Sequence, residues 1–417
     1  MDWFPLCNYT HYSLQKAFSK PKQLAEKCSK NSYRACGIAD YQSISGAVAF
    51  YMACLKENIK PIIGCSFDDF SLFAKNKNGW LELIQIVSSI SSDGELDRHL
   101  LIELANNGNL ISVASDESLS PIKGDDFYKK TPCLHTSYYT EKEHAKLHRI
   151  LLCSKMKTTV PKITKSINNG ESVDNQIFFE SNDFFVRDKI GAAELLIEDP
   201  RSKLFKEIYD KCNNYDILNQ PMLPNFETPD GESQKDYLRT LARQGWADLL
   251  GDAITDEEQK KVYGDRFRKE YKVIEQANLF GYFLIVWDII SYCQSQGWMV
   301  GPGRGSAAGC LISYLIGITQ IDPIEFNLLF ERFYNAGRNA DGHVSLPDID
   351  IDVPGGKRDE IISYLKNKYG GDNVSQMLTF GRLQGRSAIK EVLRVNNACG
   401  FGEMNEITKY IPDEAAI

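Results

Sequence analysis

Three aspartates alternate with aliphatic residues in the short stretch 346–353. In an extended segment this spacing places Asp348, Asp350 and Asp352 on one face and the aliphatic side chains on the other. Carboxylates on one face repel one another unless cations lie between them. An Asp-x-Asp pair can bind two Mg²⁺ ions, which activate a nucleophile and stabilise a leaving oxygen. The pattern therefore favours metal-dependent group transfer, and the alternative is an edge strand whose charges prevent pairing.

A glycine-rich loop at 300–309 precedes the acidic stretch. Its glycines can adopt backbone conformations that other residues avoid, so successive N–H groups can form an anion-binding nest. A helix predicted at 307–318 would add a favourable partial charge for phosphate at its N-terminus, and Arg304 and Ser306 can bind phosphate from within the loop. The loop has neither the Gly-Lys-Ser/Thr of a P-loop nor the glycine spacing of a dinucleotide site. A flexible turn between packed elements is the alternative.

Basic residues near these two motifs are candidates for binding phosphate. Arg332 and Arg338 lie between the motifs and are candidates for clamping phosphate groups. Lys357 and Arg358 directly follow the acidic stretch and are candidates for holding a backbone phosphate. For each residue taken alone, a surface ion pair or a solvated turn remains the alternative.

Several elements must position the loop and the acidic stretch. An amphipathic helix is predicted at 233–250, and the apolar run 280–293 leads into the glycine-rich loop. Met299 and Val300 are predicted to end a strand, and the alternating acids are predicted to lie on another strand. The loop and the carboxylates would then meet beside a packed core.

The first part of the chain has a different organisation. Residues 1–155 alternate between predicted strands and helices, which is the pattern of an α/β domain. The predicted helices are 20–28 and 43–55, and the predicted strands are 35–40 and 60–67. Residues 156–180 are polar and predict an extended loop, whereas 181–215 predict helix. The proline-rich stretch 220–229 is the preferred domain boundary.

Composition limits the class of protein. The chain has 417 residues, enough for two or three domains, and a net charge of −8. No run of 18 apolar residues and no signal-peptide pattern is present, so no membrane partner is predicted. The eleven cysteines include no Cys-x-x-Cys, which argues against a disulfide framework or a zinc ribbon and is typical of a cytosolic protein. A nucleic-acid binder with this charge must localise its Lys and Arg. Simple solubility is the alternative explanation of the charge.

Taken together, the motifs closely resemble the C family of bacterial replicative DNA polymerases, the DNA polymerase III alpha subunits. The resemblance depends on the order and spacing of segments 281–286, 300–309, 321–323, 327–333, 347–352, 357–360 and 374–381. It implies an α/β and α+β multidomain protein. A degenerate PHP-like α/β domain (1–219) would precede a polymerase beta-type nucleotidyltransferase palm (220–371) and the beginning of a helical thumb (372–417).

Matched residue by residue, the resemblance assigns the first two catalytic aspartates to Asp348 and Asp350, which would also bind two Mg²⁺ ions. The positions that match nucleotide-binding residues of the family are Arg304, Gly305, Ser306, Arg332 and Arg338. The implied reaction is attack of a primer 3′-hydroxyl on the alpha phosphate of a deoxynucleoside triphosphate, directed by primer–template DNA. Pyrophosphate leaves, and catalysis consists of positioning and charge neutralisation.

The N-terminal region resembles the PHP domain of the same family, a phosphoesterase-like fold, but lacks its metal ligands. The positions at which an active PHP site carries ligands hold Cys7, Tyr9, Tyr41, Ser66, Ser137 and Tyr139, and Asp40 alone is retained. No metal is therefore expected in this domain, which is predicted to be a scaffold without nuclease activity. His144 and His148 lie four apart on a predicted helix and suggest a metal pair, but the helix surface is the preferred explanation.

Two departures from the family pattern shape the functional expectation. Residues 339–343 form an insertion just before the acidic stretch, and the chain ends within the thumb region, before the family's third aspartate. We therefore expect the N-terminal piece of a split polymerase, as a phage or mobile element would encode. A second polypeptide would supply the third carboxylate, the fingers and the sliding-clamp contacts.

Two alternatives remain open. One is a self-contained minimal nucleotidyltransferase that recruits Asp359 or Glu391 as the third ligand. The other is a non-catalytic module that binds replication proteins or primer–template DNA. For all of these the expected location is the cytoplasm of a bacterial cell or of a phage-infected host.

Overall fold

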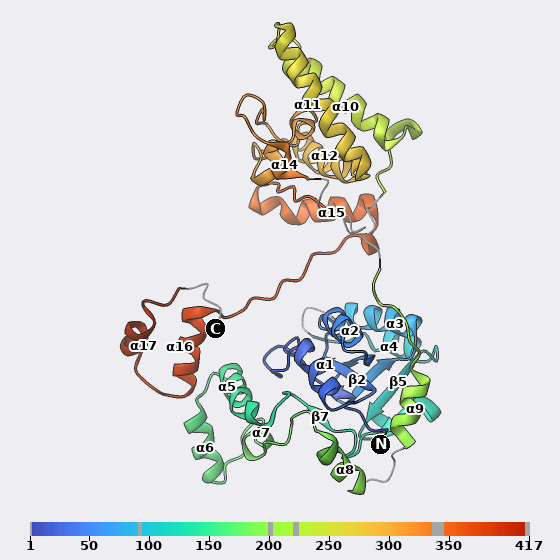
Figure 1. Cartoon of the computed structure of the whole chain (residues 1–417), viewed down its shortest axis with the longest axis vertical. Helices are drawn as coiled ribbons and strands as arrows, with labels where there is room; N and C mark the ends of the chain where they lie inside the picture. Colours follow the sequence, from blue (N-terminus) through green and yellow to red (C-terminus); the bar gives the residue numbers. More distant parts are fainter. Residues whose placement is uncertain (1, 91–93, 199–202, 220–224, 336–345, 413–417) are drawn as a thin grey trace. The chain divides into compact units, whose positions relative to one another are not determined.

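The computed structural model describes residues 2–90, 94–198, 203–219, 225–335 and 346–412. These residues form two compact units (Figure 1). The first unit contains Met1–Leu218 together with Gly381–Ile417, and the second contains Asn219–Phe380. Each unit has a hydrophobic core of its own.

A five-stranded mixed sheet forms the centre of the first unit. Its strands, in spatial order, are β2 (Ala35–Tyr41), β3 (Lys60–Ser66), β4 (Phe70–Ala74), β5 (Leu110–Ala114) and β6 (Phe127–Lys129). β4 runs antiparallel to both of its neighbours, and the other pairs are parallel. β2 and β5 are buried almost throughout, and accordingly both sequences are nearly continuous apolar runs. A separate parallel pair joins β1 (Cys7–Asn8) to β7 (Thr136–Ser137).

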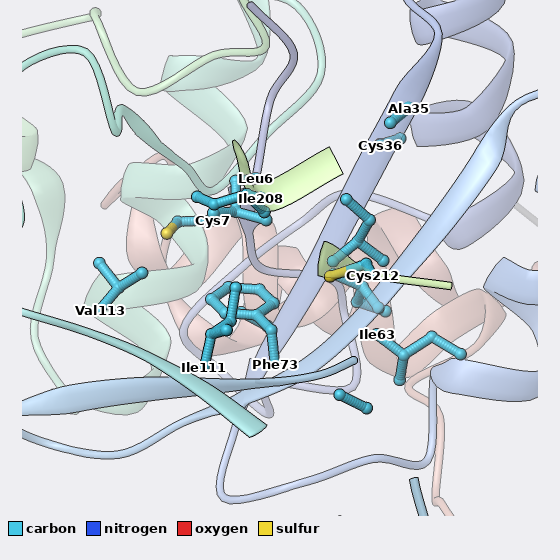
Figure 2. Packing of buried hydrophobic residues seen from close by; sticks show 14 of the residues in the cluster. Leu6, Cys7, Ala35, Cys36, Ile63, Phe73, Ile111, Val113, Ile208 and Cys212 are labelled. Atoms are coloured by element: carbon cyan, nitrogen blue, oxygen red, sulfur yellow. The ribbon is translucent and has the colours of Figure 1, made fainter. Parts of the chain in front are cut away.

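Helices precede or connect the strands of this sheet. They are α1 (Pro21–Lys30), α2 (Ala47–Lys56), α3 (Lys77–Ser88) and α4 (Arg98–Ala105). α1 has a proline in its first turn, where the missing N–H costs nothing. Phe73 and Ile111 are paired across β4 and β5 and are fully buried in the core (Figure 2). The helices and strands predicted in the first 67 residues are confirmed, with ends shifted by a few residues.

About half of the polar stretch 156–180 is helical, so the predicted extended loop is wrong for that part. It contains α6 (Val160–Asn168) and α7 (Ile177–Glu180). Thr159 caps α6 by accepting a hydrogen bond from the Lys162 N–H. The polar residues form the exposed face of α6, and Ile163 points into a small core. The helices predicted within 181–215 are present as α8 (Lys189–Glu198) and α9 (Lys203–Lys211).

A C-terminal hairpin packs on the first unit. It consists of α16 (Gly385–Val395) and α17 (Phe401–Thr408), and α16 contacts α5 (Ala145–Lys155). Val395 is fully buried in one small core with Cys153 of α5. The Ser154 hydroxyl donates to the Glu391 carboxylate at 2.5 Å. Of the residues predicted to begin a thumb, 381–412 thus lie in the same compact unit as the N-terminal α/β sheet, whereas 372–380 belong to the second unit.

The second unit is built from helices. They are α10 (Gln234–Leu250), α11 (Glu257–Gln276), α12 (Phe280–Ser295), α13 (Leu311–Leu315), α14 (Phe330–Phe333) and α15 (Arg358–Tyr369). Ser233 and Asp256 cap α10 and α11, and the helix predicted at 233–250 is confirmed. Within the described ranges, no single helix has the length and apolarity to cross a membrane. α11 and α12 satisfy that test only as a pair, and they are bent by 111°.

Two strands predicted in the second unit are not present. Within the described part of this unit, neither the residues around Val300 nor the acidic stretch is assigned to a strand. One backbone hydrogen bond joins the two segments, from the Gly301 N–H to the Asp352 carbonyl at 3.0 Å. A strand requires a ladder of such bonds, and among the described residues a single bond does not form one.

Candidate active site

The acidic stretch keeps the two-faced arrangement that its sequence predicts, although it is not a strand. Asp348, Asp350 and Asp352 are exposed. The alternating aliphatic residues, Ile349, Ile351 and Val353, are partly buried against the core of the second unit. The apolar face therefore holds the segment in place while the carboxylates face solvent.

The glycine-rich loop lies directly against these carboxylates. The Arg304 guanidinium is 3.7 Å from a carboxylate oxygen of Asp350 and 3.7 Å from one of Asp352. All three side chains are about half exposed or more, so each ion pair contributes at most about 1 kcal/mol. The sequence predicted that loop and acids serve one site, and the structure does bring Arg304 and Asp350 together. Arg304 lies at the carboxylates, where it can also be reached by a ligand from solvent.

Two glycines are required by the shape of this loop. Gly305 has φ of +66°, and a Cβ there would lie 3.0 Å from the Oδ2 atom of Asp350. Gly303 has φ of +115°, and its Cβ would lie 3.0 Å from the Thr319 side chain. Both backbone conformations favour glycine. The absence of a side chain at Gly305 therefore allows the loop to approach the carboxylate.

The predicted helix at 307–318 is broken, which is a correction to the sequence analysis. A 3₁₀ turn, Gly305–Gly309, is followed by an extended residue, Cys310, and then by the short helix α13. The Cys310 sulfur accepts a hydrogen bond from the Ser313 N–H and so starts the new helix. Ser306 therefore lies in a 3₁₀ turn, and a long helix dipole does not point at it.

Tyr282 supports the acidic stretch from α12, and sequence reasoning did not single it out. Its hydroxyl donates to the Pro347 carbonyl at 2.7 Å. Burial raises the pKa of this hydroxyl, and the charges of Asp348 and Asp350 raise it further. Segment 281–286, which contains Tyr282, contributed to the family resemblance. The sequence analysis assigned no role to this tyrosine.

The other predicted phosphate-binding residues have varied surroundings. Arg332 is exposed on α14. Arg338 and the insertion 339–343 lie outside the described residues. Lys357 pairs with Glu360 at 2.6 Å and lies 5.0 Å from the centre of the Trp298 ring. For Lys357 this favours a role in the local turn over a role in phosphate binding.

The described part of the chain contains no preformed cluster of metal ligands. Among the described residues, no group of three or more His, Cys, Asp or Glu side chains is arranged to hold a metal ion. Asp348 and Asp350 are exposed carboxylates, and oxygen is the ligand that Mg²⁺ prefers. Because Mg²⁺ is commonly bound by one or two carboxylates plus substrate phosphates, the two residues fit that ion.

In the first unit, several positions that match PHP ligand positions pack together as uncharged groups. The Tyr9 and Tyr138 rings stack with centroids 4.8 Å apart and an interplanar angle of 5°. Burial strongly raises the pKa of Tyr9, and a hydrogen bond with Ser66 only partly offsets this. Cys7 is buried nearby in β1, and burial raises the pKa of its thiol to about 11. These side chains are protonated near neutral pH and are poor metal ligands.

Asp40, the retained ligand position, is bonded to protein groups. Its carboxylate accepts from the Thr10 N–H at 2.6 Å, the Thr10 hydroxyl at 2.6 Å and the Ser13 hydroxyl at 2.5 Å. Burial raises the pKa of Asp40, and these hydrogen bonds oppose the rise. The carboxylate thus serves to fix the loop that follows β1.

The contacts of His144, at the N-cap of α5, and of His148, within α5, are explained by packing, although not as predicted. His148 is buried, whereas a helix-surface position was expected. Its Nε2 atom lies 2.8 Å from the Lys16 carbonyl oxygen, and burial lowers the pKa of His148 to about 4. His144 contacts the Thr140 hydroxyl and the Phe18 ring instead. The two histidines therefore have separate structural contacts.

The first unit is an α/β domain with altered PHP ligand positions, and the second pairs a glycine-rich loop with a row of aspartates. Together these features are typical of a PHP domain joined to a nucleotide-polymerising domain. Residues 6–125 match the PHP domain, and residues 236–417 match the bacterial DNA polymerase III alpha NTPase domain. The chain is thus a relative of the bacterial DNA polymerase III alpha subunits, as the motifs indicated, and corresponds to their N-terminal portion.

Particular relatives make this assignment concrete. The DNA polymerase III subunit alpha of Halalkalibacterium halodurans is 31% identical over 430 residues, covering 92% of this chain and 37% of that protein. The corresponding subunit of Staphylococcus aureus (strain Mu50) is 33% identical over 426 residues, covering 98% of this chain and 38% of that protein. The chain therefore spans little more than a third of the length of these relatives. A solved structure from Bifidobacterium adolescentis, provisionally described as a metal-dependent phosphoesterase, covers 21% of this chain at 16% identity. Its TM-score of 0.17 is too low to establish a shared fold.

Proposed function

We propose that this chain carries the metal- and triphosphate-binding part of a DNA-directed DNA polymerase of the C family. The observation that carries the proposal is the close approach of the glycine-rich loop to the acidic stretch. Arg304 contacts Asp350, and a side chain at Gly305 would meet the same carboxylate. In nucleotidyl transfer, phosphate and metal must lie side by side, and this arrangement provides for both.

Asp348 and Asp350 are the proposed ligands for two Mg²⁺ ions. When bound, the ions would neutralise phosphate charge and make the primer 3′-hydroxyl a better nucleophile. Asp352 lies on the same face, but its contacts are with Arg304 and, through its carbonyl, with Gly301. Asp350 shares the Arg304 contact, but the bond to Gly301 is made by Asp352, so we assign Asp352 to holding the loop.

The loop residues are proposed to bind the triphosphate. The backbone at Gly305 and the hydroxyl of Ser306 offer donors to phosphate oxygens. Arg304 can exchange its loose contacts with Asp350 and Asp352 for a charged hydrogen bond to phosphate. Arg332 and Arg338 are proposed to add positive charge around the incoming nucleotide.

The remaining parts of the enzyme are proposed to lie on a second polypeptide, which would bring the third carboxylate, the fingers and the sliding-clamp contacts. The chain covers 37–38% of the length of the relatives above, so it corresponds to only part of those proteins. The alternative of a self-contained site that uses Glu391 is disfavoured. That carboxylate accepts hydrogen bonds from Ser154 and Arg394 within the first unit, and these hold the pKa of Glu391 down at about 2. Asp359, at the beginning of α15, remains available for the alternative.

The α/β unit is proposed to act as a scaffold without nuclease activity. Two observations support this role: protein donors already bind the Asp40 carboxylate, and Tyr9, at a matched ligand position, stacks on Tyr138 as an uncharged group. Primer–template DNA and deoxynucleoside triphosphates are the proposed substrates of the assembled enzyme.

Binding of dATP in the presence of Mg²⁺ and without primer tests the proposal, because no transfer can then occur. Isothermal titration should show saturable, metal-dependent binding, and Asp350→Asn should weaken it by about tenfold or more. Asp359→Asn is the matched control and should leave the affinity unchanged. Equal affinity of the wild-type chain and Asp350→Asn would overturn the proposed site, and a loss in Asp359→Asn would favour the self-contained alternative.

A further inference from the structure

A buried ion pair lies behind the glycine-rich loop and takes no part in the proposed chemistry. Both partners are on α11. The Glu270 side chain is fully buried and that of Arg266 is 18% exposed. The Arg266 Nε–H donates to the Glu270 carboxylate at 2.5 Å. Burial raises the pKa of Glu270, and hydrogen bonds from Leu311, Ile312 and Arg266 oppose the rise.

The second carboxylate oxygen of Glu270 reaches the segment that follows the loop. It accepts from the Ile312 N–H at 3.1 Å and from the Cys310 thiol at 3.3 Å. The Ile312 N–H is in the first turn of α13, where backbone donors have no partner within the helix. Glu270 therefore fixes the point at which the 3₁₀ turn ends and α13 begins.

The outer nitrogen of Arg266 joins two further segments. Its Nη2 atom donates to the Gly309 carbonyl at 2.7 Å and to the Leu328 carbonyl at 3.1 Å. Gly309 ends the 3₁₀ turn that contains Gly305 and Ser306, and Leu328 lies just before α14, which carries Arg332. A Cβ at Gly309 would lie 2.9 Å from the Leu329 carbonyl oxygen, so the two segments are already in close contact.

We propose that Arg266 and Glu270 are positioning residues that hold the triphosphate-binding loop and the Arg332 segment in one fixed geometry. The inference rests on the proposed function of that loop. A buried ion pair is weak evidence for stability, because apolar residues of similar size often serve as well. Apolar residues, however, do not form directional hydrogen bonds. The planar guanidinium reaches two carbonyls and a carboxylate at once, and a lysine ammonium does not reproduce that fork.

Arg266→Lys separates positioning from charge, because it keeps the positive charge beside Glu270 and loses the bonds to the Gly309 and Leu328 carbonyls. The full chain is titrated with dATP and Mg²⁺, and amide hydrogen exchange is measured over residues 305–316. We expect the affinity for dATP to fall about tenfold, as misplacement of binding groups predicts, and exchange in this segment to become faster. Glu270→Gln should act in the same direction, because its single amide oxygen cannot accept both from Arg266 and from the Ile312 N–H.

Asp288→Asn is the matched control. Asp288 is also a buried carboxylate in the second unit, and it accepts hydrogen bonds from Lys368, Tyr364 and Tyr369 on α15. This control should lower the melting temperature but leave dATP affinity and exchange in 305–316 unchanged. An equal loss of affinity in Asp288→Asn would show a general effect of destabilisation and would overturn the positioning role.

The proposed function and the positioning role of Arg266 and Glu270 can be contradicted independently. If the wild-type chain binds dATP and Arg266→Lys binds it equally well, the positioning inference falls and the proposed function stands. If the wild-type chain does not bind dATP, the proposed function falls, and the exchange measurement still decides whether the pair holds the loop. If amide hydrogen exchange over residues 305–316 is unchanged in Arg266→Lys, the positioning role of the pair is overturned as well.

Discussion

At the scale of single residues, the candidate site combines a glycine whose backbone is fixed with an arginine whose side chain can move. Gly305 combines a positive φ with close approach to Asp350. Arg304 makes loose, exposed contacts with the same carboxylate. The backbone at Gly305 is rigid, whereas the contacts of Arg304 are easily exchanged. This is expected when a loop is fixed and its charged group must move to a ligand.

Replacing Gly305 with alanine tests the close approach. The positive φ alone should cost about 1 kcal/mol of stability, and the new Cβ should push the loop away from Asp350 and weaken dATP binding. Gly317→Ala is the matched control, because Gly317 has φ of +78° and open space around its Cβ. Both variants should lose similar stability in thermal unfolding, and only Gly305→Ala should lose affinity. Equal affinities of the two variants would contradict the geometry.

His148 predicts a pH dependence of the first unit. Burial lowers the pKa of His148 to about 4, from the usual value of about 6.5. Between these values the unfolded chain binds the proton and the folded chain does not, so stability falls as the pH decreases from 6.5 to 4. The contribution is at most about 3 kcal/mol. His148→Gln should make this part of the profile, measured by urea unfolding, less steep, whereas a variant of the exposed His99 should not. Some slope should remain, because burial also lowers the pKa of His135 to about 4. An unchanged slope in His148→Gln would contradict the assignment.

At the scale of elements, alternation and capping signals explain what the sequence could predict. β2 and β3 were found from apolar runs, and the burial alternation of 346–353 followed from the spacing of its aspartates. The break at Cys310 was not predictable, because it depends on a cap within the segment and on contacts with α11, which is distant in sequence. The amphipathic pattern of α6 was hidden by its many polar residues. At the candidate site, Arg304 was predictable from its position in the glycine-rich loop. Tyr282 was not, because its role depends on a tertiary contact.

The docking of α16 on α5 provides a prediction at this scale. Val395 is fully buried and Val392 on the same helix is 44% exposed. Val395→Asp would bury a charge without a partner and should release the hairpin, which limited proteolysis of 381–412 would detect as faster cleavage. Val392→Asp should be cleaved at the wild-type rate. Equal protection of both variants would show that this contact does not hold the hairpin.

At the scale of the whole molecule, the two units have separate hydrophobic cores. Leu72 is fully buried in the first and Phe283 in the second. Alanine at either position should cost about 2–5 kcal/mol in its own unit. Calorimetry should show two unfolding transitions, with Leu72→Ala lowering one and Phe283→Ala lowering the other. A single transition moved equally by both variants would mean that the units unfold cooperatively.

The split-enzyme proposal also belongs to this scale. The family assignment rests on matches over nearly the whole chain, whereas catalysis rests on two aspartates and on groups proposed to come from elsewhere. The central claim is that Asp348 and Asp350 provide the metal site of a polymerase completed by a second polypeptide.

Mg²⁺-dependent primer extension tests that claim most directly. The assay compares the chain alone, the chain with a candidate second polypeptide, and the same mixture containing Asp350→Asn. The account predicts extension only by the wild-type mixture. Extension by the chain alone that Asp350→Asn abolishes would show a complete site within these 417 residues and contradict the split enzyme. Extension by the Asp350→Asn mixture at the wild-type rate would contradict the metal site itself.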